Sequence, residues 1–228
     1  MAESTREFLA RGKSVARCEH CQLATYACLC PWQPELSSNS EFVLLMHRNE
    51  VFKPTNTGRL IADVFTHTHV FCWSRTDPDA ELIKILNDEN RCCLIVFPDD
   101  TAEAGISSRK SFAQIPITDK KITFILLDGT WKQSGRMFHL SQWLKNVPCV
   151  SLQDKMLRGY AVRKSHDENY VSTAEAAALC LKMLGEDKNS EVLLHYFQLF
   201  NEHYLATRGC YPPVLHDLHQ KLAAEKHQ

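Results

Sequence analysis

Four cysteines lie close together near the amino terminus, in a segment that could bind a metal ion. The segment reads Cys18-Glu-His-Cys21-Gln-Leu-Ala-Thr-Tyr-Ala-Cys28-Leu-Cys30, so a C-x2-C pair and a C-x-C pair are separated by six residues. Four thiolates at these spacings can surround one tetrahedral Zn²⁺ if the chain folds back on itself. Because the protein would then fill every position, we predict a structural zinc site, and an iron–sulfur cluster and incidental buried cysteines remain as alternatives.

A short polar turn with a candidate catalytic carboxylate follows an apolar run at residues 122–127. The turn reads Asp128-Gly129-Thr130-Trp131. Gly129 permits a tight turn, and Thr130 can cap a helix that begins after it. Because Asp128 emerges from an apolar strand, we expect burial to raise the pKa of its carboxyl group. A plain Asp-Gly turn is the alternative, and Trp131 could equally stack on a base or anchor the core.

Two polar segments have the composition of phosphate-binding loops. Asn56-Thr57-Gly58-Arg59 places a turn, a small residue and a guanidinium just before a predicted helix, although a plain helix cap has the same composition. The other segment combines cations with an aromatic ring, in Arg158, Tyr160, Arg163 and Lys164. Together with Arg48 and Lys53 these groups predict a local basic face, and a solvated charged surface is the alternative. His47 is a further candidate for catalysis or for contact with RNA.

Apolar runs and helical patterns alternate along the rest of the chain. Runs of strand length occupy residues 41–46, 69–73, 92–97, 122–127 and 149–152. They are continuous rather than alternating, which is typical of strands buried on both faces. Helices are expected at residues 58–66, 78–88 after an Asp77 cap, 131–144, 172–184 after a Ser172–Glu175 capping box, and about 190–207. This alternation predicts an α/β fold with a mostly parallel sheet.

The composition is that of an ordinary globular protein of 228 residues, with 44% hydrophobic and 23% charged residues. The net charge of -1 means that any surface that binds nucleic acid must be a local patch. No apolar run approaches the roughly 20 residues of a membrane span, and the amino terminus lacks an apolar signal core. We therefore expect a cytoplasmic protein without a membrane partner, in which the six remaining cysteines are small core residues: Cys72, Cys92, Cys93, Cys149, Cys180 and Cys210. Near Ser37-Ser-Asn-Ser40 we place the boundary between a metal-binding head, residues 1–36, and an α/β body, residues 37–228.

Five blocks in sequence resemble the DTW-domain family, which is named for its Asp, Thr and Trp. They are the cysteine cluster, similar to that of bacterial members, and the segments Met46–Glu50 with Thr55–Leu60, Asp128–Trp131, Arg158–Lys164 and Ser172–Ala176. The resemblance covers roughly residues 18 to 180. It implies a SPOUT-like fold with a knotted carboxyl-terminal half, S-adenosylmethionine as donor, and transfer of the 3-amino-3-carboxypropyl group to N3 of a uridine in tRNA. Methylthioadenosine would be the by-product.

The resemblance and the turn chemistry together assign expected roles to individual residues. Asp128 would accept the N3 proton or bind the amino group of the donor. The remaining donor-binding residues would be Pro98, Gly129, Thr130, Trp131, Leu152, Ser172, Thr173 and Glu175, and the tRNA-binding residues would be His47, Lys53, Asn56, Thr57, Gly58, Arg59, Arg158, Tyr160, Arg163 and Lys164. No obligate protein partner is expected. The competing hypotheses are an RNA methyltransferase of SPOUT type and a zinc-bearing RNA-binding protein without catalysis.

Overall fold

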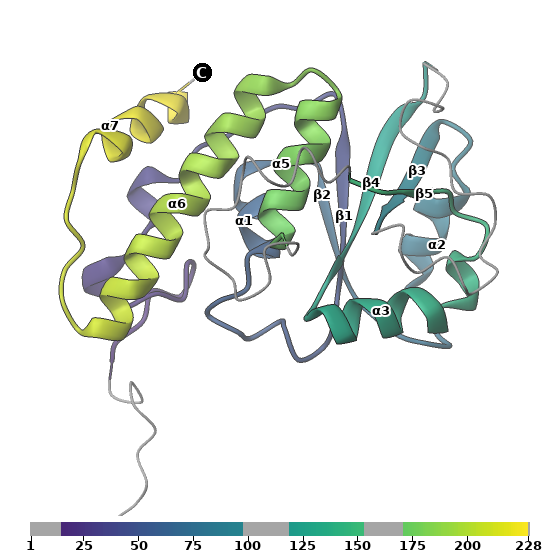
Figure 1. Cartoon of the computed structure of the whole chain (residues 1–228), viewed down its shortest axis with the longest axis horizontal. Helices are drawn as coiled ribbons and strands as arrows, with labels where there is room; N and C mark the ends of the chain where they lie inside the picture. The colour runs from purple at the N-terminus through teal and green to yellow at the C-terminus, as the bar shows by residue number, and fades with distance from the viewer. Residues whose placement is uncertain (1–14, 98–118, 153–170, 228) are drawn as a thin grey trace, which may run out of the picture.

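The computed structural model describes residues 15–97, 119–152 and 171–227. Five parallel strands form one sheet in the order β2-β1-β4-β3-β5 (Figure 1). They are β1 (Glu41–Met46), β2 (Thr68–Cys72), β3 (Arg91–Val96), β4 (Lys121–Asp128) and β5 (Cys149–Val150). The parallel α/β sheet predicted from the sequence is therefore confirmed, whereas the knot and the SPOUT topology stay predictions.

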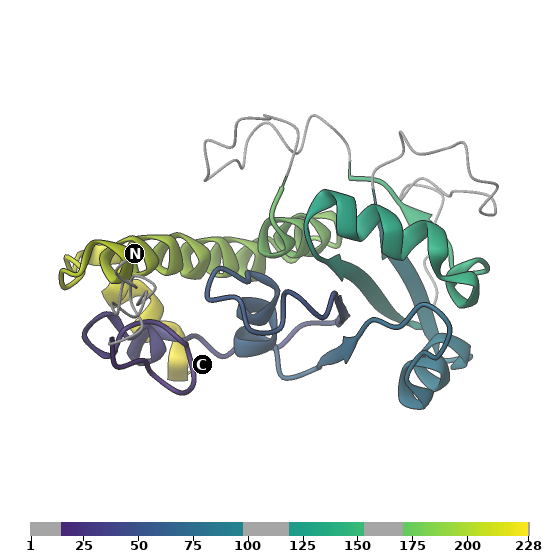
Figure 2. The ribbon, with the colours of Figure 1, turned by 90° about the horizontal axis from the view of Figure 1, so that it is seen from below.

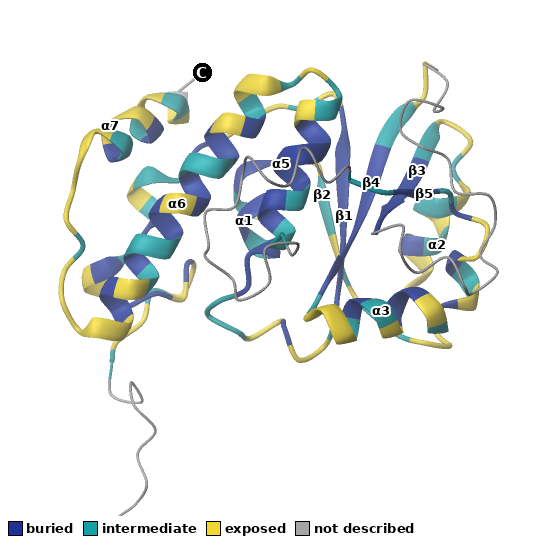
Figure 3. Ribbon diagram, viewed as in Figure 1, coloured by how far each residue is buried: buried dark blue, intermediate teal, exposed yellow. Residues whose placement is uncertain are grey.

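Helices cover both faces of the sheet, which explains why its central strands are apolar throughout. All six residues of β1 are buried. Phe42 and Leu44 join a core with the helices of one face, and Val43 and Leu45 join a separate core on the other face. The first face carries α1 (Gly58–Val64), α5 (Thr173–Met183) and α6 (Asp187–Gly209), and the second carries α2 (Ala80–Asn87) and α3 (Trp131–Leu140). Figure 3 shows the buried strands between these two layers.

Side-chain caps fix where two of the helices begin. At α5 the Ser172 hydroxyl accepts the Glu175 amide at 3.3 Å while the Glu175 carboxylate accepts the Ser172 amide at 2.7 Å, as the sequence predicts. Thr130 and Gln133 form the same reciprocal box at α3. Gly185 follows α5 with a φ of +77°, a conformation that favours glycine at the end of a helix.

Several expected helix boundaries are wrong. The cap of α2 is Asp79, whose carboxylate accepts the Glu81 amide at 2.8 Å, so Pro78 precedes the cap and Asp77 does not cap the helix. α3 ends at Leu140, and a short 3-10 turn η5 (Gln142–Leu144) follows it. α6 is longer than predicted and is followed by α7 (Asp217–Ala224) and η6 (Glu225–His227).

Among the described residues, no helix is both long and apolar enough to cross a membrane.

The amino-terminal segment packs along α6 and α7 (Figure 2). It contains the short 3-10 turns η1 (Thr25–Ala27) and η2 (Cys30–Trp32). Leu23 and Leu29 are fully buried and belong to the same core as one face of the sheet. The division into residues 1–36 and 37–228 stays a prediction, and across it the described residues share one core.

The cysteines outside the cluster divide between the core and the surface. Cys93, Cys149 and Cys180 are buried, as expected, and Cys92 is half-buried. Cys72 and Cys210 are exposed, so the expectation of a core position is wrong for them. Cys72 ends the edge strand β2, and Cys210 caps α6 in a left-handed conformation with φ of 58°. None of the ten cysteines, which all lie within the described residues, forms a disulfide.

Candidate active site and metal centre

The carboxyl ends of β1 and β4 lie side by side at the centre of the sheet. Met46, the last residue of β1, is in register with Asp128, the last residue of β4. From β1 the chain turns toward β2 through α1 on one face, and from β4 it turns toward β5 through α3 on the other face. Ligands of open α/β sheets bind at such a reversal of direction. Figure 2 views this edge of the molecule.

Asp128 is the polar centre of this edge, with only 3% of its surface exposed. The Asn56 side-chain amide donates to Asp128 Oδ2 at 2.5 Å, and the Thr173 hydroxyl donates to Oδ1 at 2.6 Å. A Cβ atom on Gly58 would lie 2.9 Å from the Asp128 carboxyl carbon, so only glycine lets α1 approach this closely. The carboxylate thus joins β4, the start of α1 and the start of α5.

Burial is the main influence on the Asp128 carboxyl group and raises its pKa. The hydrogen bonds from Thr173 and Asn56 oppose this rise because they stabilise the charged form. Glu50 adds a like charge nearby, and Lys53 counters it while pairing with Glu50 at 2.5 Å. Each carboxylate oxygen keeps a further lone pair for a ligand. The group is therefore a stronger proton acceptor than an ordinary aspartate.

Several other residues expected to bind tRNA or the donor have capping or packing roles in this structure. Asn56 also caps α1, because its Oδ1 accepts the Arg59 amide at 3.0 Å, whereas the neighbouring Thr57 is buried and makes no capping bond. Trp131 begins α3 with 36% of its surface exposed and contacts the Phe97 ring at 6.4 Å between centroids. Leu152 is half-buried against the core.

The structure gives His47 and Arg59 specific surroundings. His47 stacks on Trp73 with centroids 6.0 Å apart, and burial lowers the pKa of its imidazole. The Arg59 guanidinium donates to the backbone carbonyl of Cys21 and lies 5.7 Å over the Phe200 ring. Arg59 therefore faces the cysteine segment and not the strand ends, a placement that does not favour the predicted phosphate contact. The other predicted site residues, Pro98, Arg158, Tyr160, Arg163 and Lys164, lie outside the described residues.

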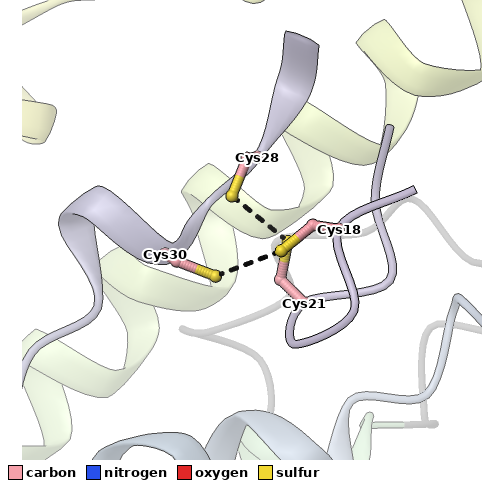
Figure 4. A group of neighbouring side chains, drawn as sticks. All are labelled: Cys18, Cys21, Cys28 and Cys30. Atoms are coloured by element: carbon pink, nitrogen blue, oxygen red, sulfur yellow. Dashed lines mark hydrogen bonds between the residues drawn. The ribbon is translucent and has the colours of Figure 1, made fainter. Parts of the chain in front are cut away.

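The four clustered cysteines converge on one point (Figure 4). Cys18 and Cys30 have their sulfurs 3.7 Å apart, those of Cys21 and Cys28 are 3.8 Å apart, and all four lie within 4.8 Å of one another. Sulfurs bonded at about 2.3 Å to one tetrahedral ion would be about 3.8 Å apart. The arrangement can therefore hold one metal ion.

Backbone amides favour the deprotonated form of Cys18, which is the form that binds a metal ion. Hydrogen bonds from the Cys21 and His20 backbone lower the pKa of Cys18 to about 6, against a smaller opposing effect of burial. Burial raises the pKa of Cys28 and Cys30. A metal ion would offset that cost, because it binds the deprotonated thiolate.

The profile of the DTW domain matches residues 15–205, which is most of the chain. The chain belongs to the DTW-domain family. Three curated relatives are each named tRNA-uridine aminocarboxypropyltransferase 2. The Mus musculus protein is 26% identical, and the match covers 90% of this chain and 73% of the relative. The Macaca fascicularis protein is 25% identical, and the match covers 77% of this chain and 58% of the relative. The Drosophila melanogaster protein is 26% identical, and the match covers 74% of this chain and 66% of the relative. No solved structure matches.

In this DTW-domain protein, sequence reasoning missed one acidic residue of the strand-end site. Glu50 is only 8% exposed, influences Asp128 electrostatically and holds Lys53. It lies in the Met46–Glu50 block that carries the family resemblance, but an isolated glutamate in a polar turn gives no sign of burial. Its position shows that the turn after β1 folds onto Asp128.

Proposed function

We propose that the protein transfers the 3-amino-3-carboxypropyl group of S-adenosylmethionine to N3 of a uridine in tRNA. The observation that carries the proposal is the DTW-domain match, which includes Asp128-Gly-Thr-Trp131 at the switch point of the sheet. The names of the three relatives support the same reaction. The chain would act on tRNA in the cytoplasm.

Asp128 is our candidate for the general base. In the proposed step its carboxylate accepts the proton of uridine N3 while the N3–Cγ bond forms and the Cγ–S bond breaks. The electron pair of the broken bond stays on sulfur, so the positive sulfonium leaves as neutral methylthioadenosine. The buried position supports this role, because it raises the pKa of the carboxyl group toward that of a useful base.

The amino-terminal end of α5 is our candidate for donor binding. The positive end of the helix dipole favours a carboxylate or hydroxyl ligand there. Thr173 links this helix end to Asp128 at 2.6 Å, so a donor held by Ser172 and Thr173 would lie beside the base. Gly129 and Thr130 at the start of α3, and Leu152 after β5, would complete the donor site.

We assign the cysteine site to structural zinc. Four thiolates suit Zn²⁺ and fill its tetrahedral shell, so no position remains for a reacting water. The sulfur separations of 3.7 and 3.8 Å support a single ion, because the ligands of a multi-iron cluster must spread around several metal atoms. A SPOUT-like knotted topology for residues 37–228 completes the proposal.

Isotope labelling of the donor tests the reaction. S-adenosylmethionine labelled in the aminocarboxypropyl carbons should transfer its label to tRNA, and donor labelled in the methyl group should not. Transfer of the methyl label alone would identify a methyltransferase. Binding of tRNA without transfer of either label would identify an RNA-binding protein that is not an enzyme.

A further inference from the structure

The turn between β1 and α1 carries an unusually exposed aromatic side chain. Phe52 has 91% of its surface exposed. The backbone on either side is fixed, because the Lys53 amide bonds to the Glu50 carbonyl and the Asn56 amide to the Lys53 carbonyl, both at 3.0 Å. One exposed apolar side chain is ordinary by itself, so its surroundings must decide what it does.

The residues that flank Phe52 belong to the Asp128 site. Glu50 and Lys53 act electrostatically on the Asp128 carboxylate, and Asn56 donates a hydrogen bond to it. At the start of α3, three residues after Asp128, Trp131 is also partly exposed. The turn after β1 and the first residue of α3, which follows β4, therefore each present an aromatic ring to solvent.

Positively charged side chains occur in the same two segments as Phe52 and Trp131. Residues 47–57 and 129–136 contain four cationic side chains and one carboxylate, in a chain whose net charge is -1. The cations are Arg48, Lys53, Lys132 and Arg136, and the carboxylate is Glu50, which is buried and paired with Lys53. Arg48, Lys53 and Arg136 all act on the His47 imidazole, which groups them around one place.

We propose that Phe52 and Trp131 are stacking platforms for unpaired bases of an RNA loop, and that the four cations bind the adjacent phosphates. This inference rests on the proposed function. N3 of uridine lies on the base-pairing edge, so the acceptor must be unpaired before N3 is accessible. Unpaired bases are recognised by stacking on aromatic rings, and a cationic groove follows the backbone beside them. Phe52 and Trp131, with Arg48, Lys53, Lys132 and Arg136, form what we call the stacking face.

Substitution of Phe52 tests the stacking face in the full-length protein. Phe52→Ala should raise the Kd for tRNA about tenfold, since stacking of one base on an aromatic ring contributes that order of affinity. The Kd for S-adenosylmethionine should not change. Phe52→Trp should restore tRNA binding, whereas Phe52→Leu, which is apolar without a ring, should behave like Phe52→Ala. Val51→Ala is the matched control, because Val51 is 43% exposed in the same turn but has no ring.

The cations of the stacking face are tested by the salt dependence of tRNA binding. Lys132→Gln and Arg136→Gln should each reduce the slope of log Kd against log salt by about 0.7, the value for one phosphate contact on a single strand. Equal tRNA affinity and equal KM in Phe52→Ala and Val51→Ala would overturn the stacking face, even if the wild type forms the expected product. If the wild type forms no such product but Phe52→Ala still binds tRNA about tenfold more weakly, the stacking face stands and the proposed function fails.

Discussion

Asp128 has one hydrogen-bond donor on each carboxylate oxygen, and both donors come from distant parts of the chain. Removal of the carboxylate would leave the Asn56 amide and the Thr173 hydroxyl without this partner in a buried place. Each such loss costs about 1–3 kcal/mol. Substitution by alanine would therefore confuse chemistry with stability, and asparagine is the better probe because it keeps the shape and one acceptor oxygen.

Asp128→Asn should lower kcat at least about a hundredfold, the lower end of what a general base contributes. The variant should still unfold cooperatively near the wild-type temperature. Asp119→Asn, an exposed carboxylate just before the same strand, is the control and should be fully active. Near-normal turnover by Asp128→Asn would remove the assigned base.

The rate of the wild type should also depend on pH in a defined direction. The base works only when it is deprotonated, so kcat should fall as the pH drops through the pKa of Asp128. Because burial raises that pKa, the fall should begin at a higher pH than for an ordinary aspartate. A pH–rate profile from single-turnover experiments measures this dependence. A rate that stays constant as the pH falls would contradict the role of Asp128 as the base.

At the scale of elements, the strand end is assembled from three chain segments that the sequence identifies separately. The Asp128–Trp131, Asn56–Arg59 and Ser172–Glu175 motifs each contain recognisable cap or turn residues. Their convergence on one carboxylate depends on contacts across 72 and 45 residues of sequence, which local patterns cannot predict. The direction of Arg59 depends likewise on how the cysteine segment docks.

The difference between local sequence patterns and long-range contacts also explains which helices and strands could be predicted from the sequence. Buried parallel strands give continuous apolar runs, and all five strands were located within a few residues. The expected burial on both faces is wrong for the edge strand β2, which has no buried residue. α7 was missed because only His219 and Leu222 of its eight residues are buried, which is too few for a clear helical pattern. Its burial depends on contacts with η2 and α6.

Gly58→Ala tests the contact between α1 and β4. The new methyl group would meet the Asp128 carboxylate at 2.9–3.0 Å, so either the helix or the carboxylate must move. We expect a loss of kcat of about tenfold or more, as small misplacements of catalytic groups are costly. Gly135→Ala is the matched control: among the described residues, no atom outside its chain neighbours and its own helix backbone lies within 4 Å of the added methyl, so activity should persist and α3 should gain up to about 1 kcal/mol. Equal activity of the two variants would contradict the assigned contact.

At the scale of the whole molecule, a buried histidine pair connects the cysteine segment to α7. His203 on α6 bonds through Nδ1 to the Ala27 carbonyl at 3.0 Å and through Nε2 to His219 Nε2 of α7 at 3.1 Å. Both rings pack edge-on against Trp32. The His216 amide donates to His219 Nδ1 at 3.1 Å, so His219 Nε2 donates to His203 Nε2 and each ring has one donor and one acceptor, which is the neutral form.

The pair predicts a loss of stability in acid. Burial lowers the pKa of both imidazoles in the folded protein, although Glu202 partly opposes it and His216 adds to it. As the pH falls below about 6.5, the unfolded chain takes up protons that the folded chain resists, so the free energy of unfolding decreases. Thermal unfolding between pH 7.5 and 5.5 should show this, with a flatter profile for His219→Gln. The exposed His67→Gln should keep the wild-type profile, and metal content measured at each pH separates this effect from metal loss.

Loss of the metal should destabilise the protein without abolishing the chemistry of the strand end. Cys18→Ser combined with Cys21→Ser should lose bound zinc and lower the unfolding temperature, because metal binding contributes folding free energy. Cys72→Ser combined with Cys210→Ser, at exposed cysteines outside the cluster, is the control. Elemental analysis and calorimetry give the two readouts. A metal-free protein with an unchanged unfolding temperature would contradict the site.

The central claim is that the aminocarboxypropyl group, and not the methyl group, reaches a uridine. The most direct test is mass spectrometry of nucleosides from tRNA incubated with the protein and S-adenosylmethionine. We predict a uridine heavier by one aminocarboxypropyl group, with methylthioadenosine formed in equal amount, and at least about a hundredfold slower formation of both products with Asp128→Asn. A uridine heavier by one methyl group, with S-adenosylhomocysteine as the by-product, would contradict the account.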